Sequence, residues 1–175
     1  MEDGSDDLKR VYKQYGTTLL GLLITKTFVF ALQLGDGDIC YANASGLELV
    51  IQPEKMLGVE THSLSRDNAW EKAITVVRRF DLADHLPAMF VLSSDGFANS
   101  YKSEDEFHNT VIDYLKMINE HGAKAVEENL PSWLSETSSM GCGDDITMLI
   151  AYFSQDDEKK VPVQEPAKDE VDAIE

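Results

Sequence analysis

The sequence contains few cysteines, and neither of them lies in a recognisable reactive motif. Its 175 residues include only Cys40 and Cys142, which are too few for a disulfide framework. The two cysteines do not form a C-x-x-C pair, and a C-x5-R phosphate-binding loop would need arginine where Gly46 and Met148 stand. We therefore expect both cysteines to be small buried apolar residues rather than nucleophiles.

Basic residues are also scarce in this chain. Lys and Arg number 15 against 32 Asp and Glu, which gives a formal net charge of −17 at pH 7. Binding to nucleic acid through its phosphates needs clustered basic side chains, so we expect no nucleic-acid partner. A solvated acidic surface accounts for most of the negative charge, and such a surface is also compatible with cation binding.

A long uninterrupted apolar run is missing as well. The most apolar stretch, residues 17–34, is broken by Lys26 and several threonines, whereas a membrane helix needs about 20 apolar residues in a row. The first residues, MEDGSDD, are acidic, which is the reverse of a secretory signal peptide. We expect a cytoplasmic protein that does not cross a membrane.

The remaining composition predicts one folded domain followed by a tail. The hydrophobic fraction of 43% is sufficient for a core in a chain of this length. Residues 154–175 contain eight acidic and three basic residues, two prolines and no aromatic residue. Such a segment buries too little apolar surface to fold. We predict a domain over residues 1–153 and an acidic disordered tail over 154–175.

In the first third of the chain, strand patterns follow a short helix. The helix is predicted over residues 6–16, and the Gly-Asp-Gly-Asp at 35–38 predicts a tight turn. β-Branched and aromatic residues predict strands on both sides of that turn. These strands cover 17–25, 27–34 and two short segments within 39–53. We expect residues 19–51 to form an antiparallel meander.

Helical patterns dominate the rest of the domain. A helix is predicted over 67–80, because Trp70, Ile74 and Val77 share one face and Asp67 or Asn68 can cap it. Buried strands are predicted over 88–95 and 146–153, and a second helical stretch over 123–137 is expected to be interrupted at Pro131.

The strongest helix signal lies at residues 103–122. Ser103 and Glu106 form a capping box, and Gly122 is placed to end the helix. The predicted buried stripe consists of Phe107, Val111, Tyr114, Leu115 and Ile118. His108 and His121 lie off this stripe and are expected to face solvent.

Aspartates follow an apolar strand at three places. They are Asp36 and Asp38, Asp95, and Asp144 with Asp145, each beside glycine. Each motif alone is more typical of a turn. Were the three strand ends to meet at one edge, the carboxylates would repel one another, and a hard divalent cation would relieve that repulsion. The sequence offers no G-x-S-x-G elbow, no phosphate loop and no H-E-x-x-H zinc motif.

Taken in order, five segments resemble one protein family. They are YGTTLLGLLI, LQLGDGDICYA, THSLS, FVLSSDGFANS and GCGDDITMLI, which together span Tyr15 to Phe153. The sequence is similar to the metal-dependent serine/threonine protein phosphatases of type 2C, and in particular to their bacterial branch. The resemblance implies an α+β fold, an α-β-β-α sandwich of mainly antiparallel sheets flanked by helices.

The same resemblance implies a function and a site. The expected reaction is hydrolysis of phosphoserine or phosphothreonine in proteins by a water that bridges Mn²⁺ or Mg²⁺, with two or more ions. Asp95 and Asp144 match ligands of the main metal pair, and Asp36 matches a residue near a weaker additional ion. Gly96 and Asp145 are expected to support the ligands or to form turns.

The chain departs from the family pattern at Asn99 and at its N-terminal side. Many relatives carry a further acid at the position of Asn99. The family also has about a third of its domain before the Gly-Thr-Thr strand, including a phosphate-binding arginine and a metal-bridging Asp-Gly, whereas 15 residues precede Gly16 here. No catalytic side chain beyond the metal ligands is therefore predicted.

Two functions remain open at this point. The first is a phosphatase with a phosphoprotein substrate. The second is a non-catalytic, metal-binding pseudophosphatase that acts as a regulatory or scaffold module. Missing strands would expose sheet surface, so a partner chain that covers this surface is also expected.

Overall fold

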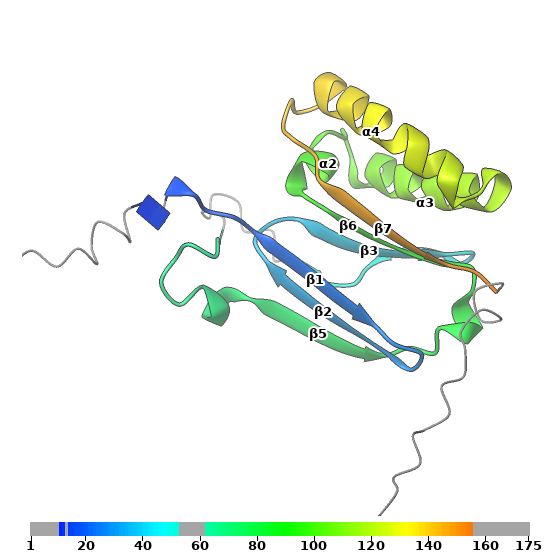
Figure 1. Ribbon diagram of the computed structural model, residues 1–175, viewed down its shortest axis with the longest axis horizontal. Coiled ribbons are helices and arrows are strands. Elements are labelled where there is room, and N and C mark those ends of the chain that lie inside the picture. Colours follow the sequence, from blue (N-terminus) through cyan, green and yellow to red (C-terminus); the bar gives the residue numbers. More distant parts are fainter. Residues whose placement is uncertain (1–10, 13, 53–61, 156–175) are drawn as a thin grey trace, which may run out of the picture.

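The computed structural model describes residues 11–12, 14–52 and 62–155 of the chain. Its strands form two antiparallel sheets packed face to face, and the longer helices lie on the outer side of one sheet (Figure 1). The strands are β1 (Leu19–Ile24), β2 (Phe28–Leu34), β3 (Asp38–Asn43), β4 (Gly46–Leu49), β5 (Ile74–Arg79), β6 (Ala88–Ser93) and β7 (Met148–Phe153). The helices are η1 (Ala69–Lys72), η2 (Ala83–His85), α2 (Asp95–Asn99), α3 (Glu104–His121) and α4 (Ala123–Met140). The predicted fold class is confirmed.

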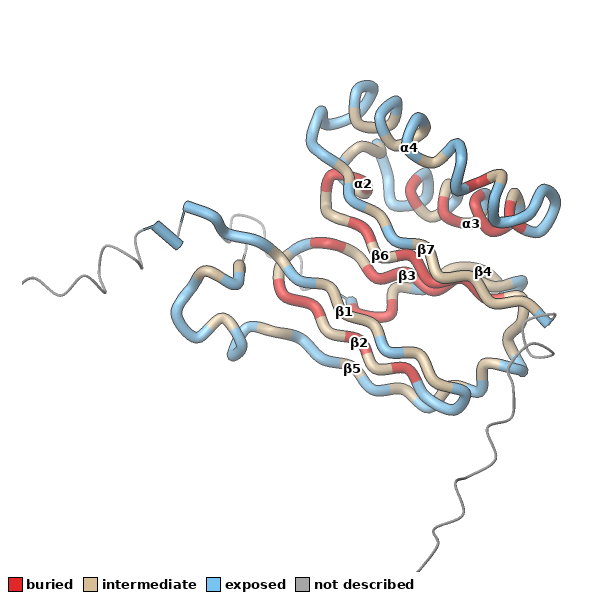
Figure 2. The backbone as a smooth tube through the Cα atoms, viewed as in Figure 1, coloured by how far each residue is buried: buried red, intermediate tan, exposed pale blue. Residues whose placement is uncertain are grey.

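The two sheets have different sizes and contacts. The smaller has the strand order β1-β2-β5, and the larger has the order β4-β3-β6-β7. One core cluster fills the space between the sheets, and a second lies between the larger sheet and the helices (Figure 2). The first includes Val29, Ala31, Ile39, Tyr41 and Phe90; the second includes Met89, Val91, Phe97, Val111 and Leu115.

Helix α3 forms as its local signals predict. The Ser103 hydroxyl accepts a hydrogen bond from the Glu106 backbone N–H at 3.2 Å, and the Glu106 carboxylate accepts one from the Lys102 N–H at 3.1 Å. Gly122 ends the helix with a φ of 86°. All five residues of the predicted stripe are buried against the larger sheet. His121 is exposed as expected, but His108 is only half-exposed, because its ring lies beside Phe107.

The predicted interruption at Pro131 is wrong. Helix α4 continues through this residue from Ala123 to Met140. Leu130, Trp133 and Leu134, on both sides of the proline, pack against the same core cluster as α3. This packing holds both halves of the helix on one axis, although Pro131 cannot donate a backbone hydrogen bond.

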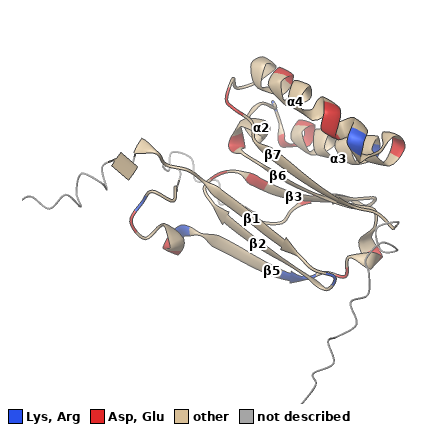
Figure 3. Cartoon of the chain, viewed as in Figure 1, with Lys and Arg blue, Asp and Glu red and all other residues tan. Residues whose placement is uncertain are grey.

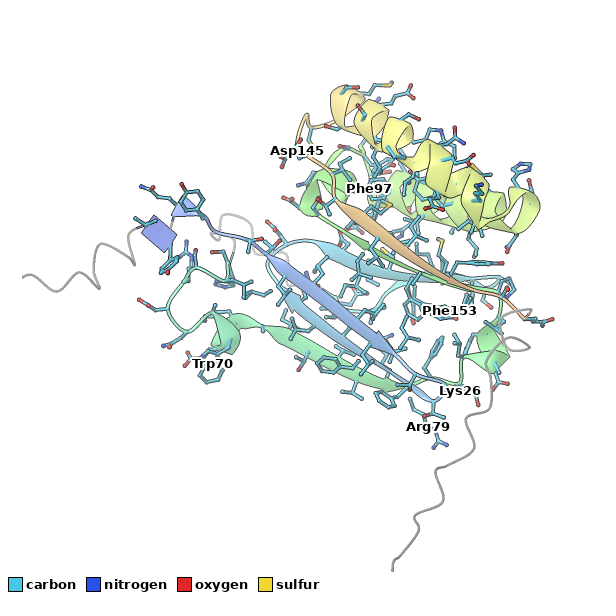
Figure 4. The ribbon with its side chains drawn as sticks, in the orientation of Figure 1. Lys26, Trp70, Arg79, Phe97, Asp145 and Phe153 are labelled. Atoms are coloured by element: carbon cyan, nitrogen blue, oxygen red, sulfur yellow. The ribbon has the colours of Figure 1, made fainter. Side chains whose placement is uncertain are left out.

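The predicted helix over 67–80 is also wrong. Only the short η1 turn is helical, and β5 begins at Ile74. Asn68 does not cap the turn with its side chain, and its φ is 58°. Trp70 is 76% exposed and points away from the sheets (Figure 4). The β-branched run after it instead pairs antiparallel with β2, which supplies the backbone hydrogen bonds that a helix would have made internally.

The expected meander is replaced by two separate hairpins. β1 pairs with β2, and β3 pairs with β4, but β2 and β3 belong to different sheets. The segment Gly35–Gly37 therefore carries the chain from one sheet to the other instead of closing a hairpin. Its backbone needs glycine at position 35, where φ is 106° and a methyl group would collide with Thr18.

The two cysteines differ in environment. Cys40 is buried, and burial raises the pKa of its thiol, with a smaller contribution from the charge of Asp38. Cys142 is exposed, so its predicted burial is wrong. It lies between Gly141 and Gly143 in the loop before β7, where its thiol donates to the Gly96 carbonyl at 3.4 Å.

Two predictions fall mostly outside the described residues. Of the predicted helix over 6–16, the structure gives a helical conformation to Val11, Tyr12 and Gln14. Of the predicted tail, it describes Ser154 and Gln155. Among the helices that the structure describes, none is long and apolar enough to cross a membrane. The cellular compartment stays a prediction.

The outer face of the smaller sheet is apolar. Leu20, Leu22 and Ile24 point into the core between the sheets, so by alternation Leu19 and Leu23 face outward. Leu23 of β1 lies opposite Phe30 of β2, and Phe30 lies opposite Val77 of β5. The exposed fractions are 53% for Leu23 and 69% for Val77. No strand of this sheet contains an acidic residue, although the chain is strongly acidic (Figure 3).

Candidate metal centre

The three aspartate motifs meet at one end of the sandwich. Asp95 follows β6, the segment with Asp144 leads into β7, and Asp36 precedes β3. Strand pairing places these ends together, because Ser93 of β6 is paired with Asp38 on one side and with Met148 on the other. Figure 3 shows acidic positions at the adjacent ends of β3, α2 and the segment before β7.

The charges of the three carboxylates act on one another. The pKa of Asp95 is raised above its ordinary value, first by burial and then by the negative charges of Asp36 and Asp144. Backbone N–H groups of Asp95 and Gly96, at the start of α2, partly offset this effect. Asp36 and Asp144 are themselves exposed. The residues predicted as metal ligands are thus brought into electrostatic contact.

Ser94 holds two of the motifs together. Its backbone N–H donates to the carbonyl of Thr147 at 2.9 Å, and its hydroxyl accepts from the N–H of Thr147 at 3.0 Å. The same hydroxyl donates to the carbonyl of Asp145 at 3.3 Å. Because Ser94 immediately precedes Asp95, these bonds set the separation between Asp95 and the Asp144–Asp145 segment.

Gly96 and Asp145 act through the backbone. A methyl group at Gly96 would lie 2.7 Å from the Asp145 carbonyl oxygen, so only glycine allows this close approach. The N–H of Asp145 donates to the Asp144 carboxylate at 2.9 Å, and the hydroxyl of Ser138 donates to the Asp144 carbonyl at 2.6 Å. Asp145 itself lies at the α2 end of the larger sheet (Figure 4).

Several contributing residues were not identified from the sequence. Ser94 and Ser138 bind backbone carbonyls of the Asp144–Asp145 segment. Asn99, which the sequence marks only as a departure from the family pattern, donates to the Asp95 carboxylate at 3.3 Å. Gln33 donates to the carbonyls on both sides of Asp36. Only Gln33 carries a sequence signal, as a polar residue at an inward position of an apolar strand.

The cluster has the chemistry of a divalent cation site but not a complete set of ligands. Carboxylates that repel one another suit a hard cation, which would offset their charge. In the described part of the chain, however, no three His, Cys, Asp or Glu side chains are arranged to hold a metal ion by themselves. The residues present fit a metal as one part of a larger site.

The sequence matches the family model for protein phosphatase 2C over residues 3–135. The chain belongs to this family. A comparison with curated proteins found no significant match. Solved structures with the same fold include bacterial serine/threonine phosphatases at 12% and 16% sequence identity.

Three of these structures show how much of the domain is shared. The Mycobacterium tuberculosis serine/threonine phosphatase PstP/Ppp is 12% identical with a TM-score of 0.57, and the match covers 86% of this chain and 68% of that one. Staphylococcus aureus Stp1 is 16% identical with a TM-score of 0.54, and the match covers 85% of this chain and 64% of Stp1. Pseudomonas aeruginosa PppA is 18% identical with a TM-score of 0.55, and the match covers 83% of this chain and 65% of PppA.

The shared length agrees with the predicted missing part of the domain. The chain spans about 62–68% of the length of the solved structures it matches. One structure of the PstP catalytic domain contains two manganese ions.

Proposed function

We propose that the chain is part of a metal-dependent protein phosphatase that hydrolyses phosphoserine and phosphothreonine. The observation that carries the proposal is the meeting of Asp36, Asp95 and Asp144 at one end of the sandwich, where burial and the charges of Asp36 and Asp144 raise the pKa of Asp95. Mn²⁺ or Mg²⁺ is the cofactor that such a set of oxygen ligands selects. When bound, these ions would neutralise phosphoryl charge and activate a water.

The side chains of this chain would have separate tasks. Asp95 and Asp144 would hold the main ions, and Asp36 would contribute to a further position. Ser94 holds Asp95 beside the segment that carries Asp144. Gly96 leaves room for that segment to approach. The remaining ligands would come from the third of the domain that the solved relatives have in addition.

The decisive test is hydrolysis of p-nitrophenyl phosphate with and without Mn²⁺. Asp144→Ala should lower the Mn²⁺-dependent rate by about 100-fold or more, because removal even of groups that only orient a metal ligand costs 10–100-fold. Asp145→Asn is the matched control, since Asp145 makes its contacts with Asp144 and Ser94 through its backbone. Its rate should stay within about 10-fold of wild type.

Two other outcomes of this assay would count against the proposed phosphatase. Metal-independent activity, or activity that survives Asp144→Ala, would contradict the proposed mechanism. An inactive chain that still binds Mn²⁺ in calorimetry would instead support the non-catalytic metal-binding module.

We also propose that a partner chain covers the outer face of the smaller sheet. Both faces of this sheet are apolar, and a sheet that is apolar on both faces is normally covered on both. The larger sheet provides the internal comparison, because α3 and α4 cover its outer face. The apolar row Leu23, Phe30 and Val77 has no such cover among the described residues.

Adjacent valines test whether this face is free in the isolated chain. Val77 faces outward and Val76 packs in the core between the sheets. Val77→Thr should change the free energy of unfolding by less than about 0.5 kcal/mol, whereas Val76→Thr should lower it by about 1–2 kcal/mol, because it buries a hydroxyl. Urea denaturation measures both. Equal losses would show that the outer face is already covered.

A further inference from the structure

Gln33 is a buried polar residue on an apolar strand. It is 1% exposed and lies on the inward face of β2, the face that also carries Val29 and Ala31. Its neighbours across the sheet are Leu20 and Ile74. The surroundings alone would favour an apolar side chain at this position.

The amide of Gln33 binds the loop that carries Asp36. Its Nε2 donates to the carbonyl of Gly37 at 2.7 Å and to that of Gly35 at 3.2 Å. These carbonyls fix the orientation of the amide, because the flipped form would place Oε1 against two acceptors. Gln33 therefore holds the carbonyls of the two residues on either side of Asp36.

The held loop is in contact with the last residue of β6, the strand that precedes Asp95. Gly37 is buried, and a methyl group there would collide with the carbonyl of Ser93, the last residue of β6. Asp95 follows two residues later. Gln33, Gly37 and Ser93 thus link the smaller sheet to the β6 end, and this link sets the position of Asp36 relative to Asp95.

The stability of the fold does not account for the choice of glutamine. The Oε1 atom of Gln33 is buried and has no hydrogen-bond partner among the described residues. A buried acceptor without a partner is destabilising, and this cost offsets part of what the two hydrogen bonds from Nε2 contribute. The side chain makes its hydrogen bonds with the loop and none with the rest of the described core.

We propose that Gln33 is a positioning residue of the metal centre, which holds the Gly35–Gly37 loop so that Asp36 faces the carboxylate cluster of Asp95 and Asp144. This inference rests on the proposed function for its metal, but the clamp on the loop is a property of the chain alone. Two readouts therefore test the proposed function and the clamp separately. Mn²⁺ affinity tests the metal site, and hydrogen exchange of the loop amides in metal-free protein tests the clamp.

The experiment uses the full chain with Gln33→Met, which keeps the size of the side chain and removes the donor. In EDTA the amides of residues 35–37 should exchange about 10-fold faster than in wild type, because the loop loses the two hydrogen bonds from the Gln33 amide. Mn²⁺ affinity in calorimetry should fall about 10-fold or more. Leu32→Met, the adjacent residue on the opposite face of β2, is the control and should change neither readout.

The contrary results are equally specific. Unchanged exchange and unchanged Mn²⁺ affinity, or a loss of stability with unchanged affinity, would make Gln33 a packing residue and overturn the proposal. If the wild-type chain does not bind Mn²⁺, the proposed function fails, whereas the exchange rates still decide whether the clamp exists. Gln33→Leu serves as a second variant if Gln33→Met does not fold.

Discussion

Asp95→Asn is expected to remove most Mn²⁺ binding and at the same time to stabilise the metal-free chain. Burial raises the pKa of Asp95, and the charges of Asp36 and Asp144 raise it further. Neutralising Asp95 deletes a metal ligand, so affinity should fall by about 100-fold or more. It also removes the repulsion, which for partly exposed charges is worth a few tenths of a kcal/mol. Wild-type protein should gain about 2.7 kcal/mol at 100 times Kd of Mn²⁺, and the variant should not.

The pH dependence follows from the direction of the shift. An acid whose pKa is raised on folding destabilises the folded state when it is ionised, and this cost disappears as the pH falls and the group becomes protonated. The stability difference between Asp95→Asn and wild type in EDTA should therefore shrink below neutral pH. Thermal melts in EDTA and in Mn²⁺ over a pH series measure both effects.

Asp84→Asn is the control for this substitution. Asp84 is exposed and lies in η2, before β6, whereas Asp95 lies after β6 at the opposite end of that strand. The control should change neither Mn²⁺ affinity nor the stability in EDTA. If Asp95→Asn destabilises the metal-free protein, the carboxylates are not in mutual repulsion and the proposed centre is wrong.

Phe97→Ala should cause the largest loss of stability, about 3–5 kcal/mol. Phe97 is 0% exposed, and its ring packs against Tyr101, Phe107 and Tyr114 with centroid distances of 5.2, 5.5 and 6.3 Å. Phe97 belongs to α2, and in Figure 4 it lies on the side of the long helices. Because Phe97 anchors the short helix that begins at Asp95, the cavity should also loosen the metal centre.

The matched comparison is Trp70→Ala, measured by urea denaturation alongside Phe97→Ala. Trp70 is the larger side chain, but it is 76% exposed. Its removal should change the free energy of unfolding by less than about 0.5 kcal/mol. A loss as large as that of Phe97→Ala would mean that Trp70 is buried, as the helical pattern of residues 67–80 suggested.

The accuracy of the sequence predictions depended on the distance between interacting residues. Helix α3 was predicted correctly, because its cap at Ser103, its stripe and its end at Gly122 all involve residues close together in the chain. The strand β5 was missed, because its hydrogen-bond partner β2 lies more than 40 residues away. A short β-branched run has no local property that tells it from a helix until the partner strand is known.

The same limit applied to the loop that carries Asp36. The glycines at positions 35 and 37 were sufficient to predict a turn. They did not indicate that the chain passes to the other sheet, since strand order depends on which faces pack together. The expected meander failed for this reason.

For the candidate site, the sequence by itself determined the residue types, which are an acid and a glycine after each of three apolar strands, and through them the family. Only the tertiary structure decided that Asp36, Asp95 and Asp144 meet, that Ser94 bonds to residues 51 and 53 positions away, and that the buried amide of Gln33 binds the loop. Charge repulsion and hydrogen bonding act over a few ångströms in space. These interactions can form only when packing of the two sheets brings distant parts of the chain within that range.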